Sequence, residues 1–277
     1  MAEQHHDVRA IKLNGNTFVT IEQHTAGLRL STHKETIVEH DGTTLVIRDP
    51  PSFVIGSSSS SSIYVGTGGR MMIQNYNGTG TIIMDNGSMF INNGSAATRE
   101  ECNTEHLIQC TYDNLSLLVC GGAMHVTVDV PLSIDSKIDV NGAGAITLIG
   151  RQRFDRLLLD VSGAGSISAN ASSIGSLCGR VTGSGKTQIT GGDNDAPLSV
   201  DSAQLVVTGS GCTQMGGATI GTATCCITGS GKIVDFTIIT SGACVPTGSG
   251  SINCNARHTA NVTETKTGSG KFKITRC

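Results

Sequence analysis

The chain has 277 residues, of which 36 are glycine and nine are aromatic, and its formal charge is −3. Asp and Glu outnumber Lys and Arg by 22 to 19, so the composition gives no basis for a nucleic-acid or membrane-surface partner. Hydrophobic residues make up 38% of the chain, which is enough to build a core and excludes a disordered polar tail. No apolar run approaches the ~18 residues that a membrane-spanning helix needs.

The first segment, residues 1–51, is predicted to form N-terminal strands that cap the rest of the fold. Apolar and polar residues alternate in short stretches at 11–13, 18–21, 28–30 and 45–47, which is typical of strands. The opening residues contain no apolar run of signal-peptide length. We therefore expect a protein that is cytoplasmic or assembled inside the cell, and association with a surface or particle stays open.

The middle of the chain is less regular but also favours strands. Six consecutive serines, Ser57 to Ser62, indicate a flexible loop. Residues 124–130 alternate apolar and polar for seven positions, which predicts a half-buried strand.

The second half is organised by a repeat. Gly-Ala-Gly occurs twice and Thr-Gly-Ser-Gly five times, with one insertion at 191–195. The first glycines of these motifs follow one another at about 20 residues: Gly142, Gly163, Gly183, Gly209, Gly229, Gly248 and Gly268. A fixed period of this length indicates a solenoid, in which one unit cannot bury its apolar face alone but stacked units can.

Within each repeat the apolar residues are spaced by two, which is strand periodicity. Two residues before the first glycine stand Val140, Val161, Val181, Val207 and Ile227, and two after the second stand Ile146, Ile167, Thr187, Thr213, Ile233, Ile252 and Phe272. Each unit is then a strand, a Gly-x-Gly corner and a second strand. The sequence predicts an all-β, single-domain parallel β-helix with coils of about 20 residues, roughly a dozen in all, in which residues 52–277 supply the coils.

These segments resemble the auto-transporter adhesin head GIN domain family. The resemblance rests on the strand pair at 10–13 and 18–21, the segment Gly42-Thr-Thr-Leu-Val-Ile47, and the later Gly-Ser-Gly repeats with flanking aliphatic residues. It covers most of the chain in the same order. It implies a β-helical fold and a surface or adhesive role, and it brings no catalytic residues.

Two features resemble functional sites but do not meet the requirements of those sites. The stretch Arg180-Val-Thr-Gly-Ser-Gly-Lys-Thr187 nearly matches a phosphate-binding loop, but that motif needs glycine where Arg180 stands. A glycan-cleaving β-helix needs acids that converge on one face. The candidates do not share one column: Asp160, Asp193, Asp195, Asp201 and Asp235. Asp193-Asn-Asp195 also lacks the further ligands of a calcium loop.

Two inward positions carry unusual residues. Asp235 falls at a position that the repeat directs into the core, so we expect a local bulge to turn it outward beside Phe236. Cys225 and Cys244 fall at the same inward position of successive coils, within disulfide reach, and we expect them to be reduced.

We expect no enzyme and no catalytic, cofactor-binding or metal-binding residues. The sequence favours a non-enzymatic structural or adhesive interaction module built on a rigid β-helix. A role as one subunit of a larger assembly is left open. The C-terminal strand at 271–277 shows no obvious cap, so the expected partners are further copies of the chain or other protein subunits, with glycans as a further option and no nucleic acid or membrane span. The alternative is a carbohydrate-binding or carbohydrate-cleaving β-helix protein.

Overall fold

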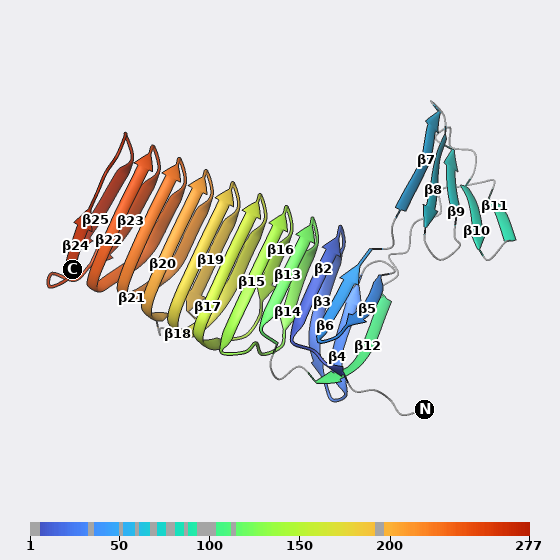
Figure 1. Ribbon diagram of the computed structural model, residues 1–277, viewed down its shortest axis with the longest axis horizontal. Coiled ribbons are helices and arrows are strands. Elements are labelled where there is room, and N and C mark those ends of the chain that lie inside the picture. Colours follow the sequence, from blue (N-terminus) through green and yellow to red (C-terminus); the bar gives the residue numbers. More distant parts are fainter. Residues whose placement is uncertain are drawn as a thin grey trace.

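The computed structural model describes residues 6–32, 36–49, 52–58, 61–66, 71–75, 81–85, 88–92, 104–111, 115–191 and 197–277. Every regular element in these ranges is a β-strand, which confirms the all-β class. The main body is a parallel β-solenoid in which each turn takes about 20 residues (Figure 1).

Each turn of the solenoid places one strand before its Gly-x-Gly corner and one after it. We call the stacked strands before the corners the leading ladder: β2 (Ala10–Gly15), β13 (Leu117–Gly122), β15 (Asp135–Gly142), β17 (Gln152–Gly163), the second half of β18 (Ser166–Gly183), β20 (Ser199–Gly209), the second halves of β21 (Cys212–Gly229) and β22 (Lys232–Gly248), and β24 (Asn261–Glu264).

The strands after the corners form the trailing ladder, which also pairs in parallel from turn to turn. It contains β3 (Phe18–His24), β14 (His125–Asp129), β16 (Ala145–Leu148), the first half of β18, β19 (Lys186–Gly191), the first halves of β21 and β22, β23 (Ser251–Ala256) and β25 (Lys271–Arg276).

The solenoid has about eight turns, fewer than the dozen predicted from the sequence. The first turn is built at Ala10–His24, and β13 stacks directly on β2 with Cys120 opposite Leu13. The described strands within residues 52–92, a range predicted to form coils, instead pair antiparallel in a second, five-stranded sheet. At ~4.8 Å per turn the stack is about 40 Å long.

The second sheet contains five short strands: β7 (Ser52–Ser58), β8 (Ser61–Gly66), β9 (Met71–Asn75), β10 (Thr81–Asp85) and β11 (Ser88–Asn92). The serine run predicted as a loop lies mostly within β7 and β8, because Ser57 pairs with Ser62 and Ser58 with Ser61 across a hairpin.

Antiparallel strands cover the N-terminal end of the stack. On the leading side, β6 (Thr44–Arg48) pairs with β2 and carries β5 (Ile37–Asp41) antiparallel on its outer edge. On the trailing side, β4 (Gly27–Thr32) pairs antiparallel with both β3 and β12 (Thr104–Thr111), and β12 pairs with β1 (His6–Asp7) (Figure 1). These strands give the first turn's edge backbone partners of its own chain.

The inward columns form one continuous core. The column before the corners is completely buried from Val140 to Ile227, as the spacing of two predicted. The column after the corners is buried from Ile146 to Ile252, but it carries two threonines, Thr187 and Thr213, that pair in register. Their hydroxyl groups have no hydrogen-bond partner.

The corner glycines are required by close approach between turns. Gly183 has a φ of +104°, and a Cβ there would lie 2.6 Å from the carbonyl oxygen of Gly163 in the previous turn. The second glycine, Gly185, has no such φ, but its Cβ would collide with Val161. Only glycine fits both needs: a left-handed backbone and the absence of a side chain.

The bulge predicted at Asp235 is confirmed. Asp235 is exposed and has a φ of +70°, and Phe236 takes the inward position and is buried. The pairing register shifts on both sides of the bulge, against β21 and against β23. A left-handed residue removes the carboxylate from the core without ending the ladder.

In the described part of the chain no strand pairs with the outer edge of β24 or β25, and charged residues lie along this edge. Glu264 pairs with Cys244, so its column position is inward, and Lys266 continues the next inward column. Arg276 donates hydrogen bonds to the carbonyl oxygens of Arg257 and Ala260, at 3.0 and 2.7 Å, and so closes a short loop against the last turn. Inward charges at an edge oppose the stacking of another sheet on it.

Candidate interaction surface

The outward residues of the leading ladder form a surface without charge over its last four strand segments. Here the outward positions hold hydroxyl, amide, thiol and small aliphatic side chains. They are Ser202, Gln204, Val206, Thr208, Thr222, Thr224, Cys226, Thr228, Ser241, Ala243, Val245, Thr247, Asn261 and Thr263. We call this set the uncharged face.

An aliphatic row runs through the centre of the uncharged face. Val206 pairs with Cys226, and Cys226 pairs with Val245, so the three side chains stack from turn to turn. All three are half-buried by their neighbours. Threonines flank the row on the corner side, where Thr208, Thr228 and Thr247 stack in register.

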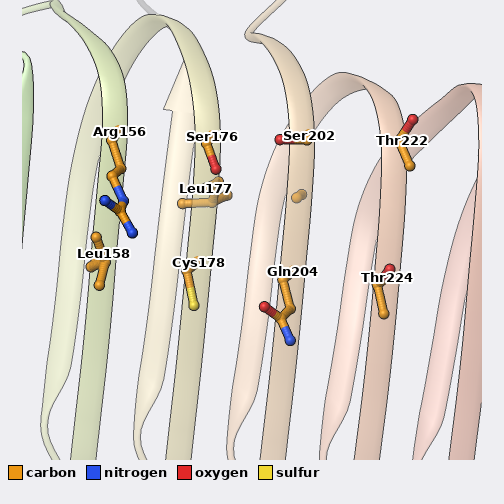
Figure 2. Close-up of a pocket in the computed structure, with 10 residues that line it drawn as sticks. Arg156, Leu158, Ser176, Leu177, Cys178, Ser202, Gln204, Thr222 and Thr224 are labelled. Atoms are coloured by element: carbon orange, nitrogen blue, oxygen red, sulfur yellow. The ribbon is translucent and has the colours of Figure 1, made fainter.

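A shallow hollow of about 550 Å³ borders the uncharged face on its N-terminal side. Figure 2 shows how small side chains create it: Cys178 lies between the longer Leu158 of β17 and Gln204 of β20. Ser176 and Ser202 line the same floor, and Arg156 stands at the end of the β17 row.

The polar groups that line the hollow are one positive charge and neutral hydrogen-bonding groups. Its lining supplies one guanidinium group, several hydroxyls and one amide, and it contains no Asp, Glu or His. Arg156 makes no ion pair with any residue that the structure describes. Acid–base hydrolysis of a glycosidic bond uses two carboxyl groups, and the hollow's lining provides none.

The acids singled out in the sequence are separated in the structure. Asp160 points outward from β17 between Asp139 and Arg180 of the neighbouring turns. Asp201 is exposed near the start of β20, and Asp235 lies on its bulge. Asp193 and Asp195 lie outside the described residues. In the described ranges, no three His, Cys, Asp or Glu side chains gather as a metal site.

The segment that resembles a phosphate loop is an ordinary corner of the solenoid. The backbone N–H groups of Ser184 and Lys186 donate to the carbonyl oxygens of Gly163 and Gly165 in the previous turn, each at 2.9 Å. These donors are therefore committed to the ladder and cannot bind an anion as a phosphate loop does.

The cysteine pair lies where the sequence placed it, and a third thiol joins it. Cys225 and Cys244 are in register, buried and free, and Cys254 from the trailing ladder meets Cys244 in the core. The hydrogen bond with Cys225 raises the pKa of Cys244 to about 12, and the bond with Cys244 raises that of Cys254. Protonated thiols of this kind react slowly.

The sequence-based reasoning missed the uncharged face and the hollow. The signal was available, because outward residues alternate with the inward columns that defined the repeat. Aligning the repeats by their glycines shows that charges disappear from these positions after Arg180. The hollow itself depends on side-chain length at three neighbouring positions, which a column of similar polarity does not reveal.

Comparison with solved structures supports the fold. A crystal structure of a "putative adhesin" from Parabacteroides merdae ATCC 43184 has a TM-score of 0.65 at 16% identity, covering 97% of this chain and 92% of that one. A "putative adhesin" from Parabacteroides distasonis ATCC 8503 gives 0.64 at 15%, covering 97% and 93%. A "putative lipid binding protein" from the same strain gives 0.65 at 18%, covering 98% and 94%.

No protein-family model matches the sequence, and no curated protein matches it either. The GIN domain resemblance is therefore supported only by neighbours that are named as adhesins or lipid-binding proteins. The described part of the chain also contains no helix of the length and apolarity needed to cross a membrane. At 15–18% identity, what this chain shares with the three crystal structures is the β-solenoid fold.

Proposed function

We propose that this chain is a non-enzymatic structural or adhesive module that associates sideways with protein subunits, a second copy of itself first among them. The observation that carries the proposal is the uncharged face with its central row Val206–Cys226–Val245. Charged residues are depleted from the core of protein interfaces. A β surface of this size without a single charge has that composition, which is unusual for a face that remains in water.

Lateral contact fits the geometry better than contact through the ends. Antiparallel strands close the N-terminal end, and Glu264 and Lys266 place charges at the C-terminal end. A twofold axis parallel to the uncharged face, lying in the plane between two copies, would set two aliphatic rows against each other, as a self-complementary interface requires.

The expected contact is weak. Four strands at ~4.8 Å, each presenting about seven residues at ~3.3 Å, give about 440 Å² per partner and about 900 Å² in total. Stable interfaces bury about 1,200 Å² or more, and smaller ones belong to transient contacts. Adhesive proteins gain strength from many weak contacts through effective concentration. A module with this face suits that mode of action.

Light scattering with size-exclusion chromatography tests the proposal. We expect wild type to form a concentration-dependent dimer or small oligomer. The double variant Val206→Lys/Val245→Lys should be monomeric, because each lysine would be buried without a partner. Val234→Lys, a matched change on the trailing ladder, should associate like wild type. A wild type that stays monomeric at ~0.5 mM, where transient contacts of this size become populated, would refute the proposal.

A further inference from the structure

The outward face of the trailing ladder carries a regular row of positive charge. Lys186, Cys212, Lys232, Ser251 and Lys271 pair in register from turn to turn, so a lysine occurs on every second turn. All three lysines are exposed. We call Lys186, Lys232 and Lys271 the lysine row, and at ~4.8 Å per turn its members are about 10 Å apart.

The lysine row is not neutralised by nearby acids. None of its ammonium groups forms an ion pair with a residue that the structure describes, and Lys186 donates to the amide oxygen of Gln188 at 2.9 Å. In the described strands of this face from Ser166 onward, Asp235 on its bulge is the one carboxylate. This face is therefore positive, although the chain as a whole carries a net negative charge.

A second row, parallel to the first, supplies hydrogen-bonding groups that are neutral except at its last member, Lys273. It runs through the outward positions two residues further along each strand and consists mainly of hydroxyl and amide side chains. Its members are Thr20, Thr127, Thr147, Ser168, Gln188, Gln214, Val234, Asn253 and Lys273. Amides and hydroxyls both donate and accept, which suits a ligand rich in hydroxyl groups.

The column of the lysine row begins at an exposed aromatic ring. Phe18 pairs with His125 and stacks on it with ring centroids 5.1 Å apart, and the column continues through Ala145 and Ser166 to Lys186. Phe18 is 57% exposed, although a large apolar side chain is normally covered. The stacked rings of Phe18 and His125 at the end of a polar row supply an aromatic surface of the kind on which sugar rings stack.

We propose that the trailing face binds an extended acidic polysaccharide lying along the solenoid axis, with one acid group on every second sugar. A pyranose ring in an extended chain spans about as much length as one turn. Acid groups on alternate sugars therefore meet the lysine row in phase, and the intervening hydroxyls face the second row. Nucleic acid fits less well, because its phosphates are more closely spaced than the lysines.

Binding is tested with hyaluronan oligosaccharides, in which a uronate alternates with a neutral sugar, against neutral dextran of equal length. Calorimetry at about 50 mM salt should show binding of hyaluronan that weakens at about 300 mM, because the contacts are exposed ion pairs. Dextran should not bind. Equal binding of dextran, or no binding of hyaluronan at low salt, would overturn the proposal.

A charge-matched pair of variants separates the lysine row from net charge. Lys186→Gln/Lys232→Gln/Lys271→Gln should bind hyaluronan about tenfold or more weakly, since exposed ion pairs each contribute up to about 1 kcal/mol. Lys12→Gln/Lys137→Gln/Arg180→Gln removes the same charge from the leading ladder and should bind like wild type. An equal loss in both variants would show attraction by net charge alone and would overturn the site.

The spacing has its own test. Ser251→Lys fills a turn between Lys232 and Lys271, so it should raise the affinity for polygalacturonate, with an acid on every sugar, more than the affinity for hyaluronan. The opposite order contradicts the phase argument. Single-stranded DNA that binds as tightly as hyaluronan would overturn the assignment to a polysaccharide.

This inference stands apart from self-association through the uncharged face. The two tests use different faces and different measurements. A monomer that binds hyaluronan would refute the proposed self-association alone, and an oligomer that ignores hyaluronan would refute the polysaccharide site alone.

Discussion

Three glycines allow the two demands of a solenoid corner to be measured separately. Gly217 has a φ of +78° and nothing within 4 Å of an added Cβ. Gly211 has no left-handed φ, but its Cβ would lie 2.7 Å from the Gly185 carbonyl oxygen and collide with Val181. Gly209 combines both, with a φ of +106° and a Cβ 2.6 Å from the oxygen of Gly183. Alanine at each position therefore tests backbone strain, crowding, and their sum.

The magnitudes follow from these contacts. A left-handed alanine costs roughly 1–2 kcal/mol, which is the expected loss for Gly217→Ala. Crowding in a packed interior costs about 1–3 kcal/mol, which is the expected loss for Gly211→Ala. Gly209→Ala should lose about 2–5 kcal/mol, the sum of these. The oxygen it would displace accepts the N–H groups of Ser210 and Gly211, both at 2.9 Å.

Urea unfolding followed by circular dichroism gives the comparison, with the slope checked for each variant because solenoids can unfold in parts. The order of stability should be wild type, then Gly217→Ala, then Gly209→Ala as the least stable. If Gly209→Ala lies within about 0.5 kcal/mol of Gly217→Ala, close approach between turns does not constrain the corner and the reasoning fails.

Three further outcomes follow from the buried groups and the bulge. Thr213→Val should stabilise the fold by about 1 kcal/mol in urea unfolding, because it replaces a buried hydroxyl without a partner by a methyl group; Thr219→Val, which loses a bond to a carbonyl oxygen, should not. Asp235→Gly should raise the thermal midpoint because glycine accepts the φ of +70° without strain, and an unchanged or lower midpoint would contradict this. Burial raises the pKa of the Cys120 thiol from 9.0 to about 11, so its contribution to stability is present below pH 9 and is lost between pH 9 and 11. Over that range the unfolding free energy of wild type should fall more steeply than that of Cys120→Ala, and parallel curves would count against the shift.

The repeat could be predicted from the sequence because its two signals are local. Glycines at a fixed period define the corners, and the spacing of two around them defines which residues point inward. Both were sufficient to place Cys225 beside Cys244 and to turn Asp235 out of the core. These predictions needed only the period, since neighbouring turns repeat the same geometry.

Pairing between distant segments could not be predicted in this way. The stacking of β13 on β2 joins residues about a hundred positions apart, and no period links them. The strands within residues 52–92 carry runs of three apolar residues and no glycine period. The sequence therefore indicates strands there but not whether they pair antiparallel or parallel. The difference lies in which strand each edge meets, which is a property of the folded chain.

The candidate surfaces depend on what the repeat leaves free. Inward positions are fixed by the core and corner positions by close approach, so the outward positions are where a solenoid of this kind can carry specificity. On the leading ladder those positions lose charge and gain an aliphatic row. On the trailing ladder the same turns carry lysines on alternate strands. Two unlike faces on one rod, with further strands over its N-terminal end and charges at its C-terminal end, favour sideways association on one side and capture of an extended polymer on the other. A rod that used both at once would link copies of itself along the polymer that it binds.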